Sequence, residues 1–334
     1  VLGIESSCDE TACAIVEDGK TILSNVVATQ IPFHEVYKGV VPEIASRKHA
    51  EWIYPVVKQA LKEANLTMDD IDAIAATNKP GLMGSLLVGF TFGKTLAWAT
   101  GKPFIAINHM LGHLYAAQLE KTVEYPFLGL LVSGGHSIIC KVSDFDKIEV
   151  LGTTIDDAVG EAFDKVAKFY NLGYPGGVVI DKLAKEGNPK AANFPMPNLK
   201  NMADKHRYDV SYSGLKTAVI NQIDQFWNPE YEKTNENICA AFQETAVKIL
   251  LSRLFKAVED TGIKTKFFVG FADVKESKYH FYYEFEDENI NRKTAEAFTQ
   301  VVDQHLQRIN LEYESKRQSF RLHDPETHIL LRDA

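Results

Sequence analysis

A short apolar strand, a polar turn and a second apolar strand follow one another twice in this chain. The first set is Val1–Ile4, Glu5–Thr11 and Ala12–Val16, and the second is Phe127–Val132, Ser133–Ser137 and Ile138–Val142. Polar turns of this kind can expose backbone N–H groups to a phosphate. The repetition predicts two related halves, and such a duplication would place two phosphate-facing turns opposite each other across a cleft.

Strand and helix patterns alternate over the first 120 residues. Apolar residues at helical spacing predict a helix over 50–65, in which Pro55 is tolerated only if it lies near the first turn. A glycine-tolerant helix is expected over 81–100, and strands over 71–76 and 104–107. This alternation favours an α/β layer.

The pattern restarts in the second half and changes near the end. Helices are expected over 156–170 and 240–260, with Gly262 just past the second helix. After Gly270 the composition shifts to an aromatic strand over 279–285, a helix over 293–312 and a strand over 327–331. We therefore expect three parts, which are 1–120, 121–270 with a helical insertion, and an atypical small α/β tail over 271–334.

His109 and His113 are spaced four residues apart, so on a helix they share one face. Both imidazoles can then reach one cation, and neutral histidine is the commonest metal ligand. An isolated pair at this spacing also arises by chance. The polar turns that flank the pair in sequence favour the metal. A peptidase is disfavoured, because the pair lacks the glutamate that HExxH enzymes use as a general base.

Charge and cysteine usage limit the function classes. The formal net charge of −9 argues against a protein that grips nucleic acid alone through broad phosphate contacts, so any nucleic acid requires a local basic patch or a partner. The four cysteines are scattered without a CxxC spacing, which fits free thiols in a reducing cytoplasm. No apolar run approaches the roughly 18 residues that span a membrane, so no membrane role is expected.

A set of ordered motifs runs from residue 1 to about 268. The matching stretches are 1–11, 41–47, 80–82, 108–113, 131–136, 160–165, 174–177, 211–217 and 241–243. Through them the chain resembles the catalytic subunit family of the bacterial tRNA N6-adenosine threonylcarbamoyltransferases. That resemblance implies the duplicated actin-like ATPase fold, an α/β architecture.

The resemblance also implies a reaction. A threonylcarbamoyl group is transferred from threonylcarbamoyl-adenylate to N6 of the adenine beside the tRNA anticodon. The expected ligands are one divalent metal ion, iron or zinc, together with the adenylate donor, and ATP is an alternative nucleotide. The expected partners are tRNA, a paralogous actin-like subunit, a small P-loop ATPase and the adenylate-forming enzyme.

Candidate site residues follow from the matched motifs. His109 and His113 are the expected metal ligands, and Asp9 and Glu10 are expected to orient a water or a second ligand. The expected substrate-binding residues are Leu131, Val132, Ser133, Gly134, Gly135, His136, Asp164, Gly177 and Asp181. Backbone N–H groups of the second polar turn suit a phosphate or carboxylate, and carboxylates such as Asp164 and Asp181 suit ribose hydroxyls. Lys165 and Lys216 are expected to be surface or tRNA-facing charges.

The resemblance stops near residue 270. The family continues with a Gly-Gly-Val-Ala-Ala-Asn turn and later a Thr-Asp-Asn-Ala motif whose aspartate completes the metal site, whereas this chain has neither. Residues 278–317 instead resemble the C-terminal domain of auxin-amido-synthetase-like acyl-adenylating enzymes. The missing aspartate predicts weaker metal binding and reduced activity, with Asp273 a poor substitute.

Two other functions remain open at this point. The chain could be a catalytically impaired actin-like subunit that binds partners, which the missing metal aspartate favours. A sugar or acyl kinase on the same fold is less favoured, because it needs a catalytic aspartate base and a sugar site, and neither is evident in the sequence.

Overall fold

The computed structural model describes residues 1–37, 39–120, 123–197 and 206–263, and the backbone alone of 266–271, 280–284, 322–323 and 330–332. The described residues form two compact units. Unit 1 contains Val1–Gln30, Pro42–His109 and the strands near the end of the chain, and unit 2 contains Ile31–Val41 and Met110–Glu284.

Unit 1 is built on a mixed sheet with the described strand order β11-β12-β3-β2-β1-β4-β5. Its first strands, β1 (Leu2–Glu5), β2 (Glu10–Glu17) and β3 (Thr21–Thr29), form an antiparallel meander. Next to β1 lie β4 (Ile74–Lys79) and β5 (Phe104–Asn108), each parallel to its neighbour. Alternate residues of β1 are buried, as expected for a strand with one face on a core.

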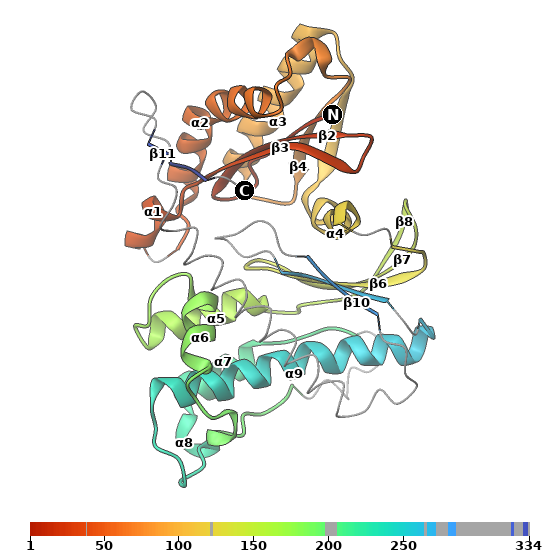
Figure 1. Ribbon diagram of the computed structural model, residues 1–334. Coiled ribbons are helices and arrows are strands. Elements are labelled where there is room, and N and C mark those ends of the chain that lie inside the picture. The colour runs from red at the N-terminus through yellow and green to blue at the C-terminus, as the bar shows by residue number, and fades with distance from the viewer. Residues whose placement is uncertain are drawn as a thin grey trace. The chain divides into compact units, whose positions relative to one another are not determined.

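Two long helices cover one face of this sheet (Figure 1). Trp52, Ile53 and Val56 of α2 (Pro42–Glu63) pack in one buried cluster with side chains of β1, β2 and β3. The second helix, α3 (Met83–Thr100), approaches the sheet closely at Gly93, where a Cβ would lie 3.1 Å from Ala76. A short 3₁₀ helix, η2 (Met68–Asp70), precedes β4.

Unit 2 repeats the same strand topology. The strands β6 (Phe127–Val132), β7 (Ser137–Asp144) and β8 (Lys147–Thr153) form an antiparallel meander, and β9 (Lys266–Phe271) lies parallel to β6. The order β8-β7-β6-β9 therefore matches β3-β2-β1-β4 of unit 1. The predicted duplication is confirmed by this correspondence.

Helices lie on both faces of the second sheet (Figure 1). On one face α4 (His109–Glu120) packs Leu114 against Phe127 and Cys140, and on the other runs α9 (Asn235–Thr261), which ends at Gly262 in the left-handed conformation. The remaining short elements of unit 2 are α1 (Ile31–His34), η1 (Glu35–Tyr37), α5 (Val159–Phe169), α6 (Gly176–Ala184), η3 (Pro189–Ala191), α7 (Ser213–Asn221) and α8 (Ile223–Phe226).

The two units differ after their shared strands. In unit 1 a helix links β4 to the parallel strand β5, whereas in unit 2 β10 (His280–Glu284) pairs antiparallel with β9. Only 272–279 separate β9 from β10, and a parallel crossover needs a dozen or more residues. Near the end of the chain, β11 (Leu322–His323) pairs with β12 (Leu330–Arg332), which joins the edge of unit 1 beside β3.

Several expectations need correction. Pro55 lies inside α2 and not near its first turn, because the helix begins at Pro42 instead of near residue 50. The proline removes one backbone hydrogen bond from the interior of the helix. The helix expected from 156 begins at Val159. The strand β8 was not predicted, and its burial pattern lacks regular alternation. The helix expected over 293–312 and most of 271–334 lie outside the described residues, so the three-part division stays a prediction.

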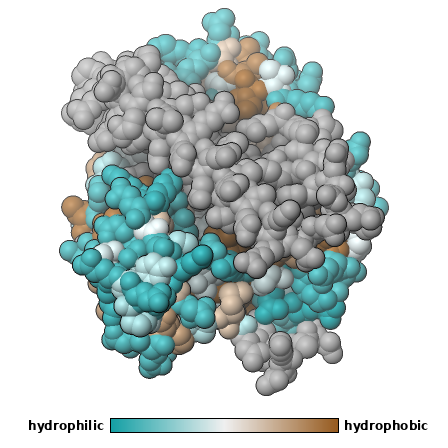
Figure 2. All heavy atoms as spheres, turned by 60° about the horizontal axis from the view of Figure 1, so that its bottom comes forward, coloured by the Kyte–Doolittle hydropathy of each residue, from teal (hydrophilic) through white to brown (hydrophobic). Residues whose placement is uncertain are grey.

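One face of the molecule is mostly polar where its residues are described. On the face drawn in Figure 2, hydrophilic side chains cover most of the described area, and exposed hydrophobic residues form small separate groups. Among the described helices, none combines the length and the apolar character that crossing a membrane requires.

Candidate active site

The predicted metal ligands lie at the start of one helix. The strand β5 ends at Asn108, α4 begins at His109, and His113 follows one turn later. The strand expected over 104–107 is confirmed, and it leads directly into the helix that carries His109 and His113. Nδ1 of His109 lies 3.2 Å from Oε2 of Glu5, the last residue of β1, and 3.2 Å from Oγ of Ser7 in the turn that follows.

Glu5 was not singled out from the sequence, although it opens the first polar turn. One of its carboxylate oxygens accepts from the Ser7 N–H, and the other accepts from Oγ1 of Thr77 at 2.5 Å. Burial works to raise the pKa of this carboxyl, but hydrogen bonds and charge from His109, with bonds from Ser7 and Thr77, lower it to about 2. Glu5 is therefore ionised at neutral pH.

A complete metal site is not assembled within the part of the chain that the structure describes, where no group of three His, Cys, Asp or Glu side chains is placed to hold an ion. Asp273 lies outside the described residues. The donor chemistry of the histidine pair nevertheless suits a divalent metal, because an imidazole whose Nδ1 faces a carboxylate is the usual form of a metal-binding histidine.

A buried histidine, which the sequence did not single out, makes hydrogen bonds to the first polar turn. His49 of α2 is fully buried, with Nδ1 2.7 Å from Oγ1 of Thr11 and Nε2 2.9 Å from the Cys8 carbonyl oxygen. A carbonyl only accepts, so Nε2 carries the proton and Nδ1 accepts from the hydroxyl. Asp9, one of the two predicted catalytic residues, is buried in this turn, and Glu10 begins β2 half-buried.

The thiol in this turn is unsuited to nucleophilic attack. Burial and the neighbouring Asp9 carboxylate raise the pKa of Cys8 well above its usual range. Because the thiolate is the reactive form, Cys8 is a poor nucleophile although its side chain is exposed.

The second polar turn is closed by two hydrogen bonds and presents mainly backbone atoms. The Ser133 N–H donates to the His136 carbonyl at 2.8 Å, and the His136 N–H donates to Oγ of Ser133 at 3.1 Å. A Cβ on Gly134 or Gly135 would meet no atom of the described residues within 4 Å. The preceding Leu131 and Val132 are buried strand residues of β6.

Glycine contacts join this turn to two helices. A Cβ on Gly160, at the start of α5, would lie 2.7 Å from Cα of Gly134 and 2.8 Å from the Ser133 carbonyl oxygen. A Cβ on Gly176, at the start of α6, would lie 2.6 Å from Cα of Asp164. Backbone therefore contacts backbone at both points. These contacts pack α5 against the turn and α6 against α5, and the three segments are called the turn support below.

Asp164 on α5 and Asp181 on α6 have different surroundings within the turn support. Oδ1 of Asp164 accepts from the Gly176 N–H at 2.7 Å, and burial raises the pKa of this carboxyl above its usual value despite that bond. Asp181 is one turn beyond Gly177 on α6, where it pairs with Lys185 at 2.8 Å and accepts from Gln243 at 3.2 Å. A Cβ on Gly177 would meet no described atom within 4 Å.

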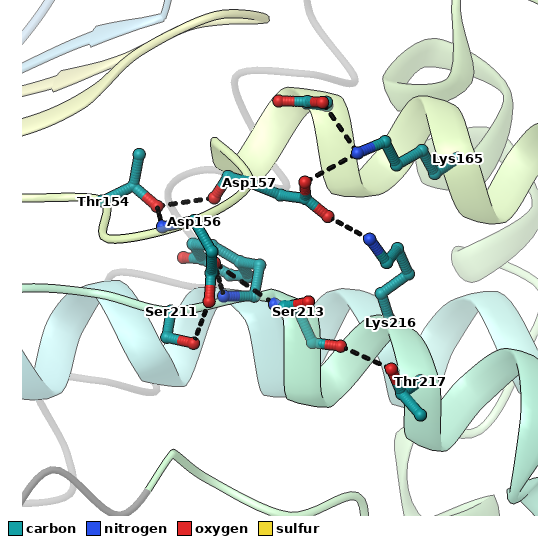
Figure 3. Close-up of polar contacts among 10 residues, drawn as sticks. Thr154, Asp156, Asp157, Lys165, Ser211, Ser213, Lys216 and Thr217 are labelled. Atoms are coloured by element: carbon teal, nitrogen blue, oxygen red, sulfur yellow. Dashed lines mark hydrogen bonds and ion pairs between the residues drawn. The ribbon is translucent and has the colours of Figure 1, made fainter.

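The loop before α5 carries a polar cluster that the sequence did not reveal (Figure 3). Asp157 lies between two lysines, Lys165 of α5 at 2.6 Å and Lys216 of α7, so both lysines pair with a carboxylate. Burial opposes ionisation, but the two lysines lower the pKa of Asp157. Beside it, Asp156 accepts from the backbone N–H of Tyr212 at 2.8 Å, where α7 begins.

Comparison with known proteins decides the family. The sequence model described as tRNA N6-adenosine threonylcarbamoyltransferase matches residues 21–296. The enzyme of that name from Treponema denticola is 77% identical over 265 residues, which cover 79% of this chain and 78% of the relative. The chain belongs to the tRNA N6-adenosine threonylcarbamoyltransferase family. The enzyme from Brachyspira hyodysenteriae is 52% identical over 264 residues, covering 79% of this chain and 77% of the relative.

The structure comparison bears on the fold alone. HypF from T. kodakarensis is similar with a TM-score of 0.52 at 11% identity, over 83% of this chain and 42% of that chain. A full-length HypF in a phosphate- and nucleotide-bound form gives 0.51 at 11% identity, over 81% and 48%. With the repeated sheet topology of the two units, the fold is the duplicated actin-like ATPase fold.

Family membership fixes the reaction of this threonylcarbamoyltransferase. The enzyme is an acyltransferase that moves a threonylcarbamoyl group to N6 of an adenosine in tRNA. Its family uses an adenylate donor and is in general metal-dependent. The motifs quoted from 1–268 had already indicated this family.

Proposed function

We propose that the second polar turn and its supporting helices bind the threonylcarbamoyl-adenylate donor. The Ser133 and His136 N–H groups bond within the turn, so the backbone N–H groups of Gly134 and Gly135 would receive the phosphate or the carboxylate of the donor. Asp164 and Asp181 would accept hydrogen bonds from ribose hydroxyls. The observation that carries this proposal is the close backbone contact at Gly160 and Gly176, which holds the turn, α5 and α6 together. Beside this contact, a Cβ on Gly134, Gly135 or Gly177 would meet no described atom within 4 Å.

We further propose that His109 and His113 hold one divalent ion, iron or zinc, since imidazole suits both. When bound, such an ion supplies Lewis acidity to a carbonyl or phosphoryl oxygen. Support comes from the helical spacing of the two residues and from the carboxylate facing Nδ1 of His109. With fewer protein ligands among the described residues, water or substrate would complete the coordination.

Asp9 and Glu10 are proposed to orient a water or a second ligand in the first polar turn. The adenine amine is a weak nucleophile, so the reaction requires that the amine and the acyl carbon be positioned close together and in the correct orientation. Support comes from the rigid seat of this turn on buried His49, which fixes the backbone between Cys8 and Thr11.

The acceptor is proposed to be the adenine beside the anticodon, and the setting the cytoplasm. The net charge of −9 makes it unfavourable for the chain to hold tRNA alone. We therefore propose that a paralogous actin-like subunit and a small P-loop ATPase assist, while a separate enzyme makes the adenylate.

Two binding measurements test these assignments separately. AMP affinity, measured by calorimetry, should fall in Asp164→Asn, whose shape is unchanged, and should stay at the wild-type value in His109→Ala. Zinc affinity should fall in His109→Ala and should stay at the wild-type value in Asp164→Asn. If the Asp164 variant binds AMP as wild type does, the donor assignment is wrong, and if His109→Ala binds zinc as wild type does, the metal assignment is wrong.

A further inference from the structure

Glu5 is held by three separate parts of unit 1. Its carboxylate accepts from the Ser7 N–H in the turn, from Oγ1 of Thr77 on β4 at 2.5 Å, and contacts Nδ1 of His109 at 3.2 Å. The side chains of Glu5 and His109 are only 34% and 22% exposed, so neither moves as freely as a surface group. The carboxylate is thus fixed on both oxygens before it meets the imidazole.

That fixed carboxylate decides which nitrogen of His109 carries the proton. An ionised carboxylate only accepts hydrogen bonds, so Nδ1 must be the N–H donor in this contact. Oγ of Ser7, also 3.2 Å from Nδ1, can serve as a second acceptor. In a neutral imidazole with the proton on Nδ1, Nε2 is the unprotonated nitrogen, and an unprotonated nitrogen is the one that can bind a metal.

We propose that Glu5 is a positioning residue, which holds His109 as its Nδ1–H form and turns Nε2 toward a divalent metal ion. The proposal rests on the metal site proposed above. Partners of this kind orient ligating histidines and raise their basicity, and their loss typically costs 10- to 100-fold in metal affinity.

Glu5→Gln is the sharpest variant, because it keeps the size of the side chain and changes its hydrogen bonding. An amide group can donate to Nδ1, which stabilises the opposite, Nε2–H form. A purely structural cross-link between β1 and β4 would respond mainly to loss of the Thr77 hydroxyl. Thr77→Val removes that bond and leaves the His109 contact, and Glu51→Gln removes an exposed glutamate of α2 that pairs with Lys48.

The first measurement is ¹⁵N NMR of histidine-labelled, metal-free full-length protein, with His109 assigned by its absence in His109→Ala. Wild type should show the Nδ1–H form for this residue, and Glu5→Gln should shift it toward the Nε2–H form. An Nε2–H form in wild type would overturn the proposal, and this readout needs no variant to bind metal.

The second measurement is zinc affinity by competition with a chromophoric chelator. We expect a 10- to 100-fold loss in Glu5→Gln, at most a few-fold loss in Thr77→Val, and no change in Glu51→Gln. Lost affinity in His109→Ala with wild-type affinity in Glu5→Gln contradicts the role of Glu5 alone. Wild-type affinity in His109→Ala contradicts the metal site itself, so the two failures are distinguishable.

Discussion

The two units share a topology but differ in the turn that follows their first strand. In unit 1 the turn after β1 carries Glu5, Asp9 and Glu10, and side chains from other elements fix it, among them His49 of α2. In unit 2 the turn after β6 offers mainly backbone, and the close packing of Gly160 fixes it. The two related halves thus carry different turns, one that presents carboxylates and one that presents mainly backbone.

We expect the largest effect from a substitution that displaces the backbone of the second turn. In Gly160→Ala the added Cβ would lie 2.7 Å from backbone of Gly134, so the turn must shift. Misplacement by about 1 Å can cost about 100-fold in rate, and we expect a loss of that order in AMP affinity or transfer. Gly214→Ala, whose Cβ meets no described atom within 4 Å, is the matched control and should behave as wild type.

For the first turn, we expect a loss of stability when buried His49 is replaced. His49→Ala leaves a cavity and removes the partners of the Cys8 carbonyl and the Thr11 hydroxyl, so the free energy of unfolding should fall by about 3 kcal/mol. Urea denaturation measures this loss. A change below about 0.5 kcal/mol would show that the turn does not depend on His49.

Acid should weaken unit 2 through Asp157. Its pKa is lowered in the folded state, so its contribution is present above the unfolded value of about 3.9 and is lost as pH falls through the lower folded value. Asp157→Asn should cost about 1 kcal/mol at pH 7 and show a flatter stability profile below pH 4. Equal acid sensitivity in the variant would contradict the role of the two lysines.

The smallest effect has the opposite sign. The pKa of Asp164 is raised in the folded state, so its ionisation lowers stability as pH rises from about 3.9 through the folded value. Asp164→Asn should therefore be more stable than wild type at pH 7 while losing donor affinity. A variant that is less stable at pH 7 would be inconsistent with this account; unfolding at pH 4 and pH 7 measures the difference.

Local pattern predicted the parts of the fold that depend on neighbouring residues. The strand of 127–132, the start of a helix at His109 and the left-handed residue at Gly262 all follow from spacing, apolar runs and turn residues. The duplicated strand topology was visible as a repeated polar turn. These features need no knowledge of which distant residues meet.

The rest of the candidate site depends on long-range contacts. Glu5 meets a histidine 104 positions away, His49 reaches a carbonyl 41 positions away, and Lys216 reaches Asp157 across 59 positions. No periodicity encodes such pairs. A glutamate directly after a buried strand and a histidine on the inner face of α2 were the available signals, and their chemistry became clear only once the partners were known.

Transfer of labelled threonine to unmodified tRNA tests the division between the two turns most directly. The assay would contain the adenylate-forming enzyme and the partner subunits, with AMP binding measured on the same preparations. We predict that wild type transfers, that His109→Ala loses transfer but keeps AMP affinity, and that Asp164→Asn loses both. Transfer by His109→Ala at the wild-type rate would contradict the account, and no transfer by wild type with normal partner binding would favour an impaired, partner-binding subunit.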